Sequence, residues 1–515
     1  MAEHYEALVL GGGHNGLVAA NYLAAAGVGV LVLERRDFVG GACVTEELFP
    51  GFRAPSCSYV CHLLQGKVIE DLELRRHGFE VHALEPYRLH PFPHGQYIQV
   101  WQDDARTAEE IRRISPPDAA RFGAWAEFWK RAAGILHRYF LRQPPTLAQV
   151  AAEVGGTPDE DVFERMLTGN MKDLVEEYFE SDMVRATLIE AHDAGDVRAP
   201  GSIMAVAYIK CNHFTEARNL GIPHGGMGGI TQAMERAARE RGVEIRTGVE
   251  VERIEVRGGR AVGVVLKDGG VIGADVVLSN ADPKRTFLKL VEREVLEPDF
   301  VAGIERLKTD ISCLKFHCAL RELPDFSAYF GEDLEPRHLA QVRICPSVAY
   351  FEQSWAEARS GKVSSCPVMY VQIPSVCDAS LTPPGQHVMS VWSLYAPVRL
   401  REGTWDEARQ GAGEHLIDAL ALYAPNLRQA IIDWQLFTPA DLEERVYLTD
   451  GNIRHLDIVP EQMLARRPNR RLSGYRTPIG GLYLCGAGTH PGGEVTGAPG
   501  HNAAGVVLRD LGVEV

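Results

Sequence analysis

Hydrophobic and polar positions at the start of the chain change from a strand-like to a helix-like pattern and back. An apolar run at residues 5–10 is followed by GGGHNGLVAANYLAAAG at residues 11–27 and VGVLVLE at residues 28–34. A short, continuous apolar run bounded by turn residues is typical of a buried strand, whereas the alanine-rich stretch from residue 15 to 26 favours a helix. The pattern therefore predicts a strand, a glycine turn, a helix and a second strand.

The glycine turn carries a dinucleotide-binding pattern. Gly11, Gly13 and Gly16 fit G-x-G-x-x-G. In such a turn the first glycine makes the tight bend, the second lets backbone approach a pyrophosphate, and the third lets helix and strand pack closely. Glu34 ends the second strand, where an acid binds ribose hydroxyls. With all these parts in order, a dinucleotide site is favoured over an ordinary glycine-rich turn.

The middle of the chain reads as the remainder of the same domain. Helical periodicity runs over residues 229–241, and short strand-like runs with hairpin turns fill residues 243–281. The glycines at positions 225–229 are not surrounded by a second βαβ unit with a ribose-binding acid. We therefore interpret them as a tight helix entry and not as a second phosphate loop.

The C-terminal segment repeats the strand, glycine loop and helix order. Residues 482–485 form a buried strand-like run, glycines are dense from 486 to 500, and residues 502–510 predict a closing helix. A glycine-rich backbone can lie flat against a ligand. Such a loop suits the ribityl, pyrophosphate and pyrimidine edge of a flavin, with the helix N-terminus stabilising negative charge on the reduced ring.

A paired glycine after Glu34 distinguishes FAD from NAD. Gly40-Gly41 is similar to the segment that runs under the FAD pyrophosphate in amine-oxidase-like and carotenoid-desaturase-like flavoproteins. Disulfide reductases have a similar pair followed by C-x-x-x-x-C. Cys43 matches the first cysteine of that motif, but Leu48 occupies the second position. A second G-x-G-x-x-G for NADPH is also missing from the sequence, so dithiol chemistry is disfavoured.

Five stretches together carry a family resemblance: LVLGGGHNGLVAANYLAAAG, PHGGMGGITQAM, VLSNADP, DGNIRHLD and GLYLCGAGTHPGGEVTGAPGHNAAG. The chain resembles the phytoene-dehydrogenase-related FAD oxidoreductases. These include the bacterial-type carotenoid desaturases and, more closely, the pyridine nucleotide-disulphide oxidoreductase domain-containing protein 2 group. The resemblance spans the whole chain. It implies FAD contacts at Gly11, Gly13, His14, Asn15, Gly16, Glu34, Arg35, Gly41, Val251, Gly486, Gly488 and Thr496.

Candidate catalytic side chains are few. Relatives tend to have a third glycine where this chain has Glu494, so an acid is expected near the flavin. His490 lies in the same loop, and both are our candidates for acid–base work. His192 and Asp193 are a weaker pair, and His455 belongs to a family-like motif that is equally consistent with bracing a domain junction. The sequence shows no metal-ligand cluster.

The expected fold class is α/β: a Rossmann-like FAD-binding domain of the glutathione-reductase/amine-oxidase type interleaved with an α+β substrate domain. The FAD-binding domain is assigned to residues 1–75, 220–300 and 471–515, and the substrate domain to residues 76–219 and 301–470. The second domain carries neither glycine signature. Its helical pattern at residues 118–143 and its strand-like runs predict a sheet covered by helices.

Charge, cysteine spacing and the length of apolar runs limit the classes of partner and the location that we expect for the protein. The formal net charge of −16 disfavours a nucleic-acid partner. Ten cysteines without zinc-ribbon spacing are read as mostly reduced thiols. Apolar runs fall short of the ~20 residues of a membrane span, and the first strand leaves no room for a signal peptide. We expect a cytoplasmic protein, with peripheral membrane contact and oligomeric state left open.

These observations predict an FAD-dependent dehydrogenase or oxidase that removes hydride from an apolar, lipophilic small molecule. Without a second dinucleotide domain, quinone or oxygen is the expected electron acceptor. Two alternatives within enzymes are an amine oxidase-like activity and a flavin-dependent saturase or isomerase. The alternative outside enzymes is a flavin-bound interaction or scaffold protein with little turnover.

Overall fold

The computed structural model describes residues 3–191, 195–211 and 220–513. Its first sheet has seven strands, in the order β10-β11-β12-β1-β2-β9, with β18 also paired to β12. The strands are β1 (Glu3–Leu10), β2 (Val30–Leu33), β9 (Glu244–Arg246), β10 (Val251–Arg257), β11 (Arg260–Leu266), β12 (Val271–Ser279) and β18 (Leu482–Leu484). β1, β2, β9, β12 and β18 are joined by parallel pairings, while β10, β11 and β12 form the antiparallel meander.

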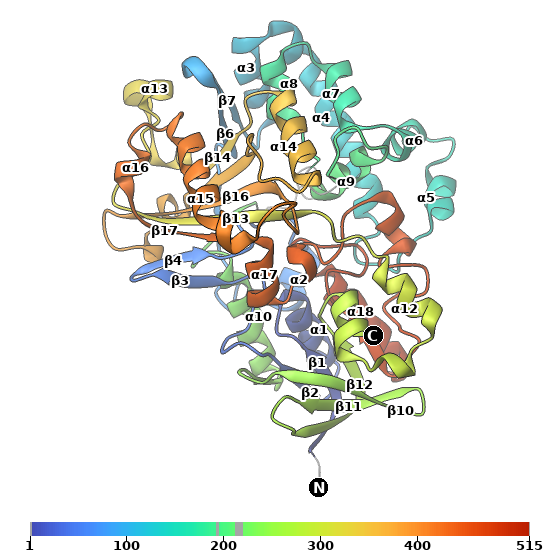
Figure 1. The fold of residues 1–515 in the computed structure, drawn as a ribbon. Coiled ribbons are helices and arrows are strands. Elements are labelled where there is room, and N and C mark those ends of the chain that lie inside the picture. The colour runs from blue at the N-terminus through green and yellow to red at the C-terminus, as the bar shows by residue number, and fades with distance from the viewer. Residues whose placement is uncertain (1–2, 192–194, 212–219, 514–515) are drawn as a thin grey trace.

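Three helices pack together beside this sheet: α1 (His14–Ala25), α10 (Gly228–Glu240) and α18 (Ala498–Asp510). α1, from one end of the chain, lies against α18, from the other (Figure 1). Gly500 allows the close approach, because a Cβ there would lie 2.1 Å from the carbonyl oxygen of Asn15. The expected start of α18 at residue 502 was wrong. The helix begins four residues earlier, since Pro499 has the backbone angle that a first helical turn requires.

The second sheet also has seven strands, ordered β17-β13-β16-β15-β14-β6-β7. All of its neighbours pair antiparallel except β14 and β6. The strands are β6 (Arg88–Pro91), β7 (Tyr97–Val100), β13 (Ser312–Leu320), β14 (Gln341–Ile344), β15 (Met369–Gln372), β16 (His387–Ala396) and β17 (Ile431–Phe437). β13 and β16 are almost wholly buried, and most of their side chains are apolar.

Helices cover this second sheet. α15 (Trp405–Ala421) shares a hydrophobic core with its strands, and α14 (Val348–Arg359) packs on β16. A further group of helices lies beyond the sheet, away from β1 and β2 (Figure 1). It consists of α3 (Asp104–Ile114), α4 (Pro116–His137), α5 (Leu147–Val154), α6 (Glu160–Thr168), α7 (Met171–Tyr178), α8 (Asp182–Leu188) and α9 (Ser202–Ile209).

The expected α/β class with an interleaved chain is confirmed. All strands of the first sheet come from residues 1–75, 220–300 and 471–515, and all strands of the second from residues 76–219 and 301–470. The domain boundaries themselves stay a prediction. In the described part of the chain, no helix is both long enough and apolar enough to cross a membrane.

Candidate active site

A cavity of about 370 Å³ lies where the two sheets meet. Its lining joins the glycine turn after β1, the start of β10, the loop after β12 and the C-terminal glycine loop to side chains of the second sheet. The predicted site residues that line the cavity are Gly11, Gly13, His14, Asn15, Glu34, Arg35, Gly41, Val251 and Glu494. Segments far apart in the sequence therefore contribute to one cavity of the size of a small-molecule site.

The glycine turn leaves the start of α1 open toward the cavity. Gly13 is the N-cap of α1, and no side chain caps the first N–H groups of the helix. Asn15 is 1% exposed, and its Oδ1 has no hydrogen-bond partner among the described residues. A Cβ at Gly16 would lie 2.2 Å from the Gly11 carbonyl oxygen, so only glycine allows this turn. Uncapped helix amides donate to phosphate oxygens and so fit a bound pyrophosphate, whereas Asn15 Oδ1 can only accept a hydrogen bond from a ligand.

Backbone N–H groups hold the carboxylate of Glu34, the predicted ribose-binding acid. The Glu34 carboxylate accepts hydrogen bonds of 2.9 Å from the N–H groups of Gly12 and Arg36. Each carboxylate oxygen has two lone pairs, so Glu34 can still accept hydrogen bonds from a ligand hydroxyl. Gly40 donates to the Gly12 carbonyl at 2.7 Å, and the neighbouring Gly41 has a φ of +57°. The residues at this end thus fit the adenosine and pyrophosphate of FAD.

An arginine–tyrosine–arginine stack stands at the adenosine end and was missed in the sequence. The guanidinium of Arg35 lies 3.7 Å from the ring centroid of Tyr447, and that of Arg285 lies 3.6 Å from it. Tyr447 Oη donates to Glu250 at 2.6 Å. Tyr447 directly follows α17 (Pro439–Val446). The stack therefore connects the segment after α17 with Arg35, which follows β2. Sequence spacing gives no signal for it, because its members come from three distant segments.

Several predicted FAD contacts lie beside the cavity without lining it. Gly16, Gly486, Gly488 and Thr496 are absent from the lining. A Cβ at Gly486 would lie 2.6 Å from the Asn280 carbonyl oxygen, and one at Gly488 would lie 2.5 Å from Pro283. These glycines allow the loop to pack on the segment after β12. Their direct contact with FAD stays a prediction.

Glu494 faces an arginine in the cavity. Its carboxylate forms an ion pair with Arg454, and both side chains are nearly buried. Glu494 has a φ of +67°, a conformation that glycine adopts without steric cost. Its carbonyl oxygen lies 3.1 Å from His14 Nε2. The loop therefore directs one ionisable pair toward the space between the glycine turn and the second sheet.

The cavity histidines are neutral at ordinary pH. Burial lowers the pKa of His14 to about 4 and that of His455 to about 3, with a further lowering from Arg467 for His455. Both line the cavity. A neutral imidazole donates and accepts hydrogen bonds without adding charge. His14 and His455 are consequently suited to holding polar atoms, and Arg454 with Glu494 supplies the charges at this point.

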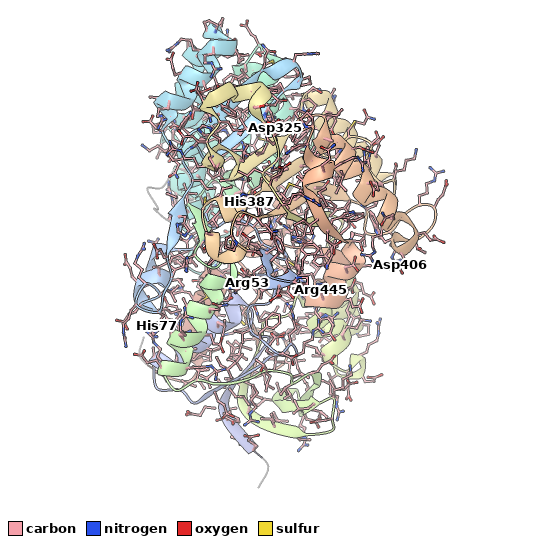
Figure 2. The ribbon with its side chains drawn as sticks, turned by 90° about the vertical axis from the view of Figure 1, so that its left-hand side faces the viewer. Arg53, His77, Asp325, His387, Asp406 and Arg445 are labelled. Atoms are coloured by element: carbon pink, nitrogen blue, oxygen red, sulfur yellow. The ribbon has the colours of Figure 1, made fainter. Side chains whose placement is uncertain are left out.

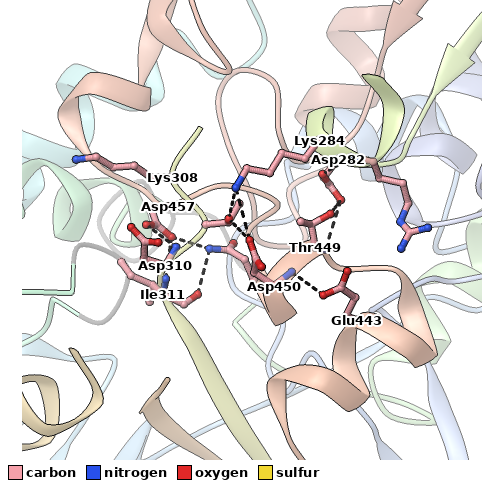
Figure 3. Close-up of polar contacts among 12 residues, drawn as sticks. Asp282, Lys284, Lys308, Asp310, Ile311, Glu443, Thr449, Asp450 and Asp457 are labelled. Carbon is pink, nitrogen blue, oxygen red and sulfur yellow. Dashed lines mark hydrogen bonds and ion pairs between the residues drawn. The ribbon is translucent and has the colours of Figure 1, made fainter. Parts of the chain in front are cut away.

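A buried polar network holds the loop that delivers Arg454 and His455 (Figure 3). Asp457 accepts hydrogen bonds from the N–H groups of Asp310 and Ile311, both at 3.1 Å. Asp282 accepts from Thr449 Oγ1 at 2.7 Å. Burial raises the pKa of Asp457 to about 6 despite these donors. The network connects the segment after β12 with both ends of the loop, which fixes the cavity wall.

Two aromatic side chains contribute to the cavity wall. Tyr59 and Trp392 both line the cavity, with their ring centroids 5.3 Å apart. Lys315, on β13, is buried behind Tyr59, with its Nζ 5.8 Å from the Tyr59 ring centroid. Lys315 donates to Ser390 at 3.0 Å, and burial lowers its pKa to about 8. These residues belong to no motif, so no pattern in the sequence points to them.

The other candidate catalytic residues do not meet in the cavity. His490 is 2% exposed, and its Nε2 lies 2.9 Å from the Tyr139 carbonyl oxygen. It is not part of the cavity lining, and burial lowers its pKa to about 4. This geometry fits a brace between the C-terminal loop and the end of α4, and the catalytic role of His490 stays a prediction. His192 and Asp193 lie outside the described residues.

Comparison with known proteins agrees with this geometry. The family model described as flavin containing amine oxidoreductase matches residues 16–317. Pyridine nucleotide-disulfide oxidoreductase domain-containing protein 2 from Mus musculus is 34% identical, over 98% of this chain and 94% of that protein. Phytoene desaturase (lycopene-forming) from Pseudescherichia vulneris is 26% identical, over 98% and 99%. A triple mutant of putrescine oxidase shares the fold, with a TM-score of 0.64 at 12% identity over 99% of each chain.

The predicted family resemblance and the FAD assignment are thereby confirmed. Cys43 lacks the properties of a redox-active cysteine. It is a free, buried thiol, and burial raises its pKa to about 12. Such a thiol is not poised for dithiol exchange. The chain belongs to the flavin-containing amine oxidoreductase family and is an FAD-dependent oxidoreductase.

Proposed function

We propose that this flavoprotein desaturates or dehydrogenates an apolar organic molecule. The observation that carries the proposal is the apolar part of the cavity lining. It includes the rings of Tyr59 and Trp392 and the aliphatic side chains of Ile453 and Val495. Aromatic and aliphatic walls bind apolar ligands through burial of apolar surface. The desaturase relative supports the same substrate class.

Desaturation removes a hydride and a proton from neighbouring carbons. The bound flavin supplies the hydride acceptor. The proton needs a side chain or water within reach of the substrate. Glu494 is the candidate base, because its carboxylate lines the cavity and is held in place by Arg454. Tyr59 and Trp392 would orient the substrate against the cofactor and exclude water from the reacting bond.

Quinone or oxygen is the proposed acceptor of the electrons. The sequence offers one βαβ dinucleotide unit with a ribose acid, and that unit belongs to FAD. Reoxidation of the reduced protein by air and by a soluble quinone, followed side by side, tests this part. A faster reoxidation by pyridine nucleotide than by either would contradict it.

The main test is anaerobic reduction of the bound flavin with a library of unsaturated hydrocarbons, terpenes and amines. Bleaching of the flavin absorbance by an apolar member, together with a product that has gained a double bond, is the expected result. Reduction by amines alone would replace the proposal with the amine oxidase-like alternative. Reduction by no member, in a protein with full FAD content, would favour the scaffold alternative.

Peripheral membrane contact belongs to the same proposal, because a lipophilic substrate partitions into bilayers. In the described residues the exposed large apolar side chains lie in separate parts of the chain: Phe38, Val271, Val295, Leu422, Ile432 and Leu511. Co-sedimentation with neutral and anionic vesicles measures the contact. Substrate turnover that is equal in detergent and in vesicles, without co-sedimentation, would argue against it.

A further inference from the structure

Three metal-ligating side chains meet outside the cavity. His82 is the middle residue of β5 (Val81–Ala83), and His224 directly follows β8 (Gly221–Pro223). β5 and β8 pair antiparallel, with His82 opposite Ile222. Residues two apart on a strand share a face, so His224 is the diagonal neighbour of His82 on the same side of the ribbon. Their ring centroids lie 5.9 Å apart, and the backbone N–H of His224 donates to the Glu80 carbonyl at 3.0 Å.

The third ligand lies in a segment that follows a strand of the second sheet. Asp378 lies between the short helices η6 (Pro374–Val376) and η7 (Ala379–Leu381), which follow β15. It is 4% exposed, and its Oδ2 accepts from the Gly225 N–H at 2.6 Å and lies 3.5 Å from His224 Nδ1. Its Oδ1 accepts from the N–H and Oγ of Ser380. Hydrogen bonds of this kind fix the orientation of a ligating carboxylate.

An unpaired nitrogen points to a ligand. One ligand atom from each of His82, His224 and Asp378 lies within 4.8 Å of the other two. His82 Nε2 is buried and has no hydrogen-bond partner among the described residues. A buried polar atom without a hydrogen-bond partner is destabilising, and a ligand bound at this position would satisfy His82 Nε2. In the part of the chain that the structure describes, this is the single group of such ligands.

We propose that His82, His224 and Asp378 bind one divalent transition-metal ion of the Zn²⁺ type. Two imidazoles and one carboxylate form a donor set that suits Zn²⁺ and poorly suits Ca²⁺ or Mg²⁺, which prefer oxygen ligands. Binding draws the donors together, since ligand bonds to Zn²⁺ are ~2.0–2.2 Å long. His224 supplies that movement, because its side chain is 55% exposed while Asp378 is fixed. Water from the exposed side completes the coordination.

The position of the site gives the ion a bracing role. Asp378 belongs to the second sheet's connections, whereas His224 opens the glycine loop that enters α10. Gly221 of β8 exchanges backbone hydrogen bonds with Cys61, both at 2.9 Å, and Cys61 is two residues from Tyr59 of the cavity wall. None of the three ligands lines the cavity. The ion would therefore stabilise the junction between the sheets without entering the reaction, although the sequence predicted no metal centre.

The test uses the full-length, FAD-loaded protein after treatment with a chelator. Isothermal titration with Zn²⁺ should show one saturable site, and Co²⁺ should give the visible absorption bands of a low-symmetry nitrogen and oxygen site. H224N and D378N should each weaken Zn²⁺ binding by at least about tenfold. Zn²⁺ should raise the melting temperature of the wild-type protein and leave that of H224N unchanged, because binding to the folded state alone stabilises it.

A matched control separates this site from incidental binding by other side chains. His77, labelled in Figure 2, is also buried and lies 3.8 Å from the carboxylate of Glu240 on α10. It belongs to no three-ligand group among the described residues, so H77N should bind Zn²⁺ like the wild type. If D378N fails to fold, the Zn²⁺ affinity of H224N alone tests the proposal, because an exposed side chain such as that of His224 can be replaced without disturbing the core. No saturable binding by the wild type, or equal binding by wild type and H224N, would overturn the proposal.

Discussion

Replacement of Gly13 by valine should separate cofactor binding from folding. The backbone at Gly13 has φ −69° and ψ 167°, which valine adopts without strain. A Cβ there would lie 2.7 Å from Asn280 Nδ2, the movable end of a side chain. The fold should therefore lose only ~1–3 kcal/mol, the usual range for a small overpacking.

The loss in FAD affinity should be larger. The added methyl groups enter the cavity at the uncapped start of α1, where backbone N–H groups would hold the pyrophosphate. Hydrogen bonds to a charged group contribute ~1.5–3 kcal/mol each. Displacing the pyrophosphate from two of them costs ~3–6 kcal/mol, which corresponds to a ~10²–10⁴-fold weaker Kd.

The assay is FAD titration of the deflavinated protein, followed by tryptophan fluorescence, with circular dichroism as the check on folding. Gly123→Ala is the control, since Gly123 lies in α4 with open space around its Cα. That variant should bind FAD like the wild type. A Gly13→Val protein that folds and binds FAD with unchanged Kd would refute the assignment of the glycine turn to the pyrophosphate.

Three further predictions concern side chains. Cys43→Ser should leave flavin reduction intact, because Cys43 is a buried free thiol without a redox partner at Leu48; loss of reduction with FAD still bound would revive the dithiol mechanism. Glu494→Gln should slow anaerobic flavin reduction by ~10²-fold or more at unchanged FAD content, and an unchanged rate across pH would remove Glu494 from the mechanism. Burial raises the pKa of Asp457 in the folded protein to about 6. Protonated Asp457 therefore stabilises the fold fully below pH ~4, and this contribution is lost as the pH rises through 6. Urea unfolding should show wild type losing up to ~3 kcal/mol relative to Asp457→Asn between these pH values, and a pH-independent difference would contradict the burial argument.

The local parts of the fold could be predicted from sequence because each carries its own pattern. The strand, glycine turn and helix at the N-terminus follow from residues within one short segment, and α1 and α10 begin within one residue of their expected positions. The exception is α18, which begins inside the glycine-rich segment. Pro499 lies in its first turn, where proline is favoured, so the proline and not the last glycine marks the start of the helix.

The cavity wall could be predicted only in part. Backbone-lined positions such as Gly11 and Gly41 follow from motif spacing, since the motif itself describes the turn. Tyr59, Trp392, Arg285 and Tyr447 lie in segments whose contacts depend on how two sheets dock. Aromatic residues in buried strands are also ordinary core residues, so no pattern marks the few that face a ligand.

The pairing of β12 with both β1 and β18 has a consequence for how the protein is made. The glycine turn after β1 leaves the ribosome long before β18 and α18, which complete its surroundings. Until these two elements emerge, α1 lacks its packing against α18, and long-range pairing of this kind is slow and prone to aggregation. Because FAD that binds the folded state stabilises it, we expect the yield of folded protein to rise with the FAD supply of the producing cell.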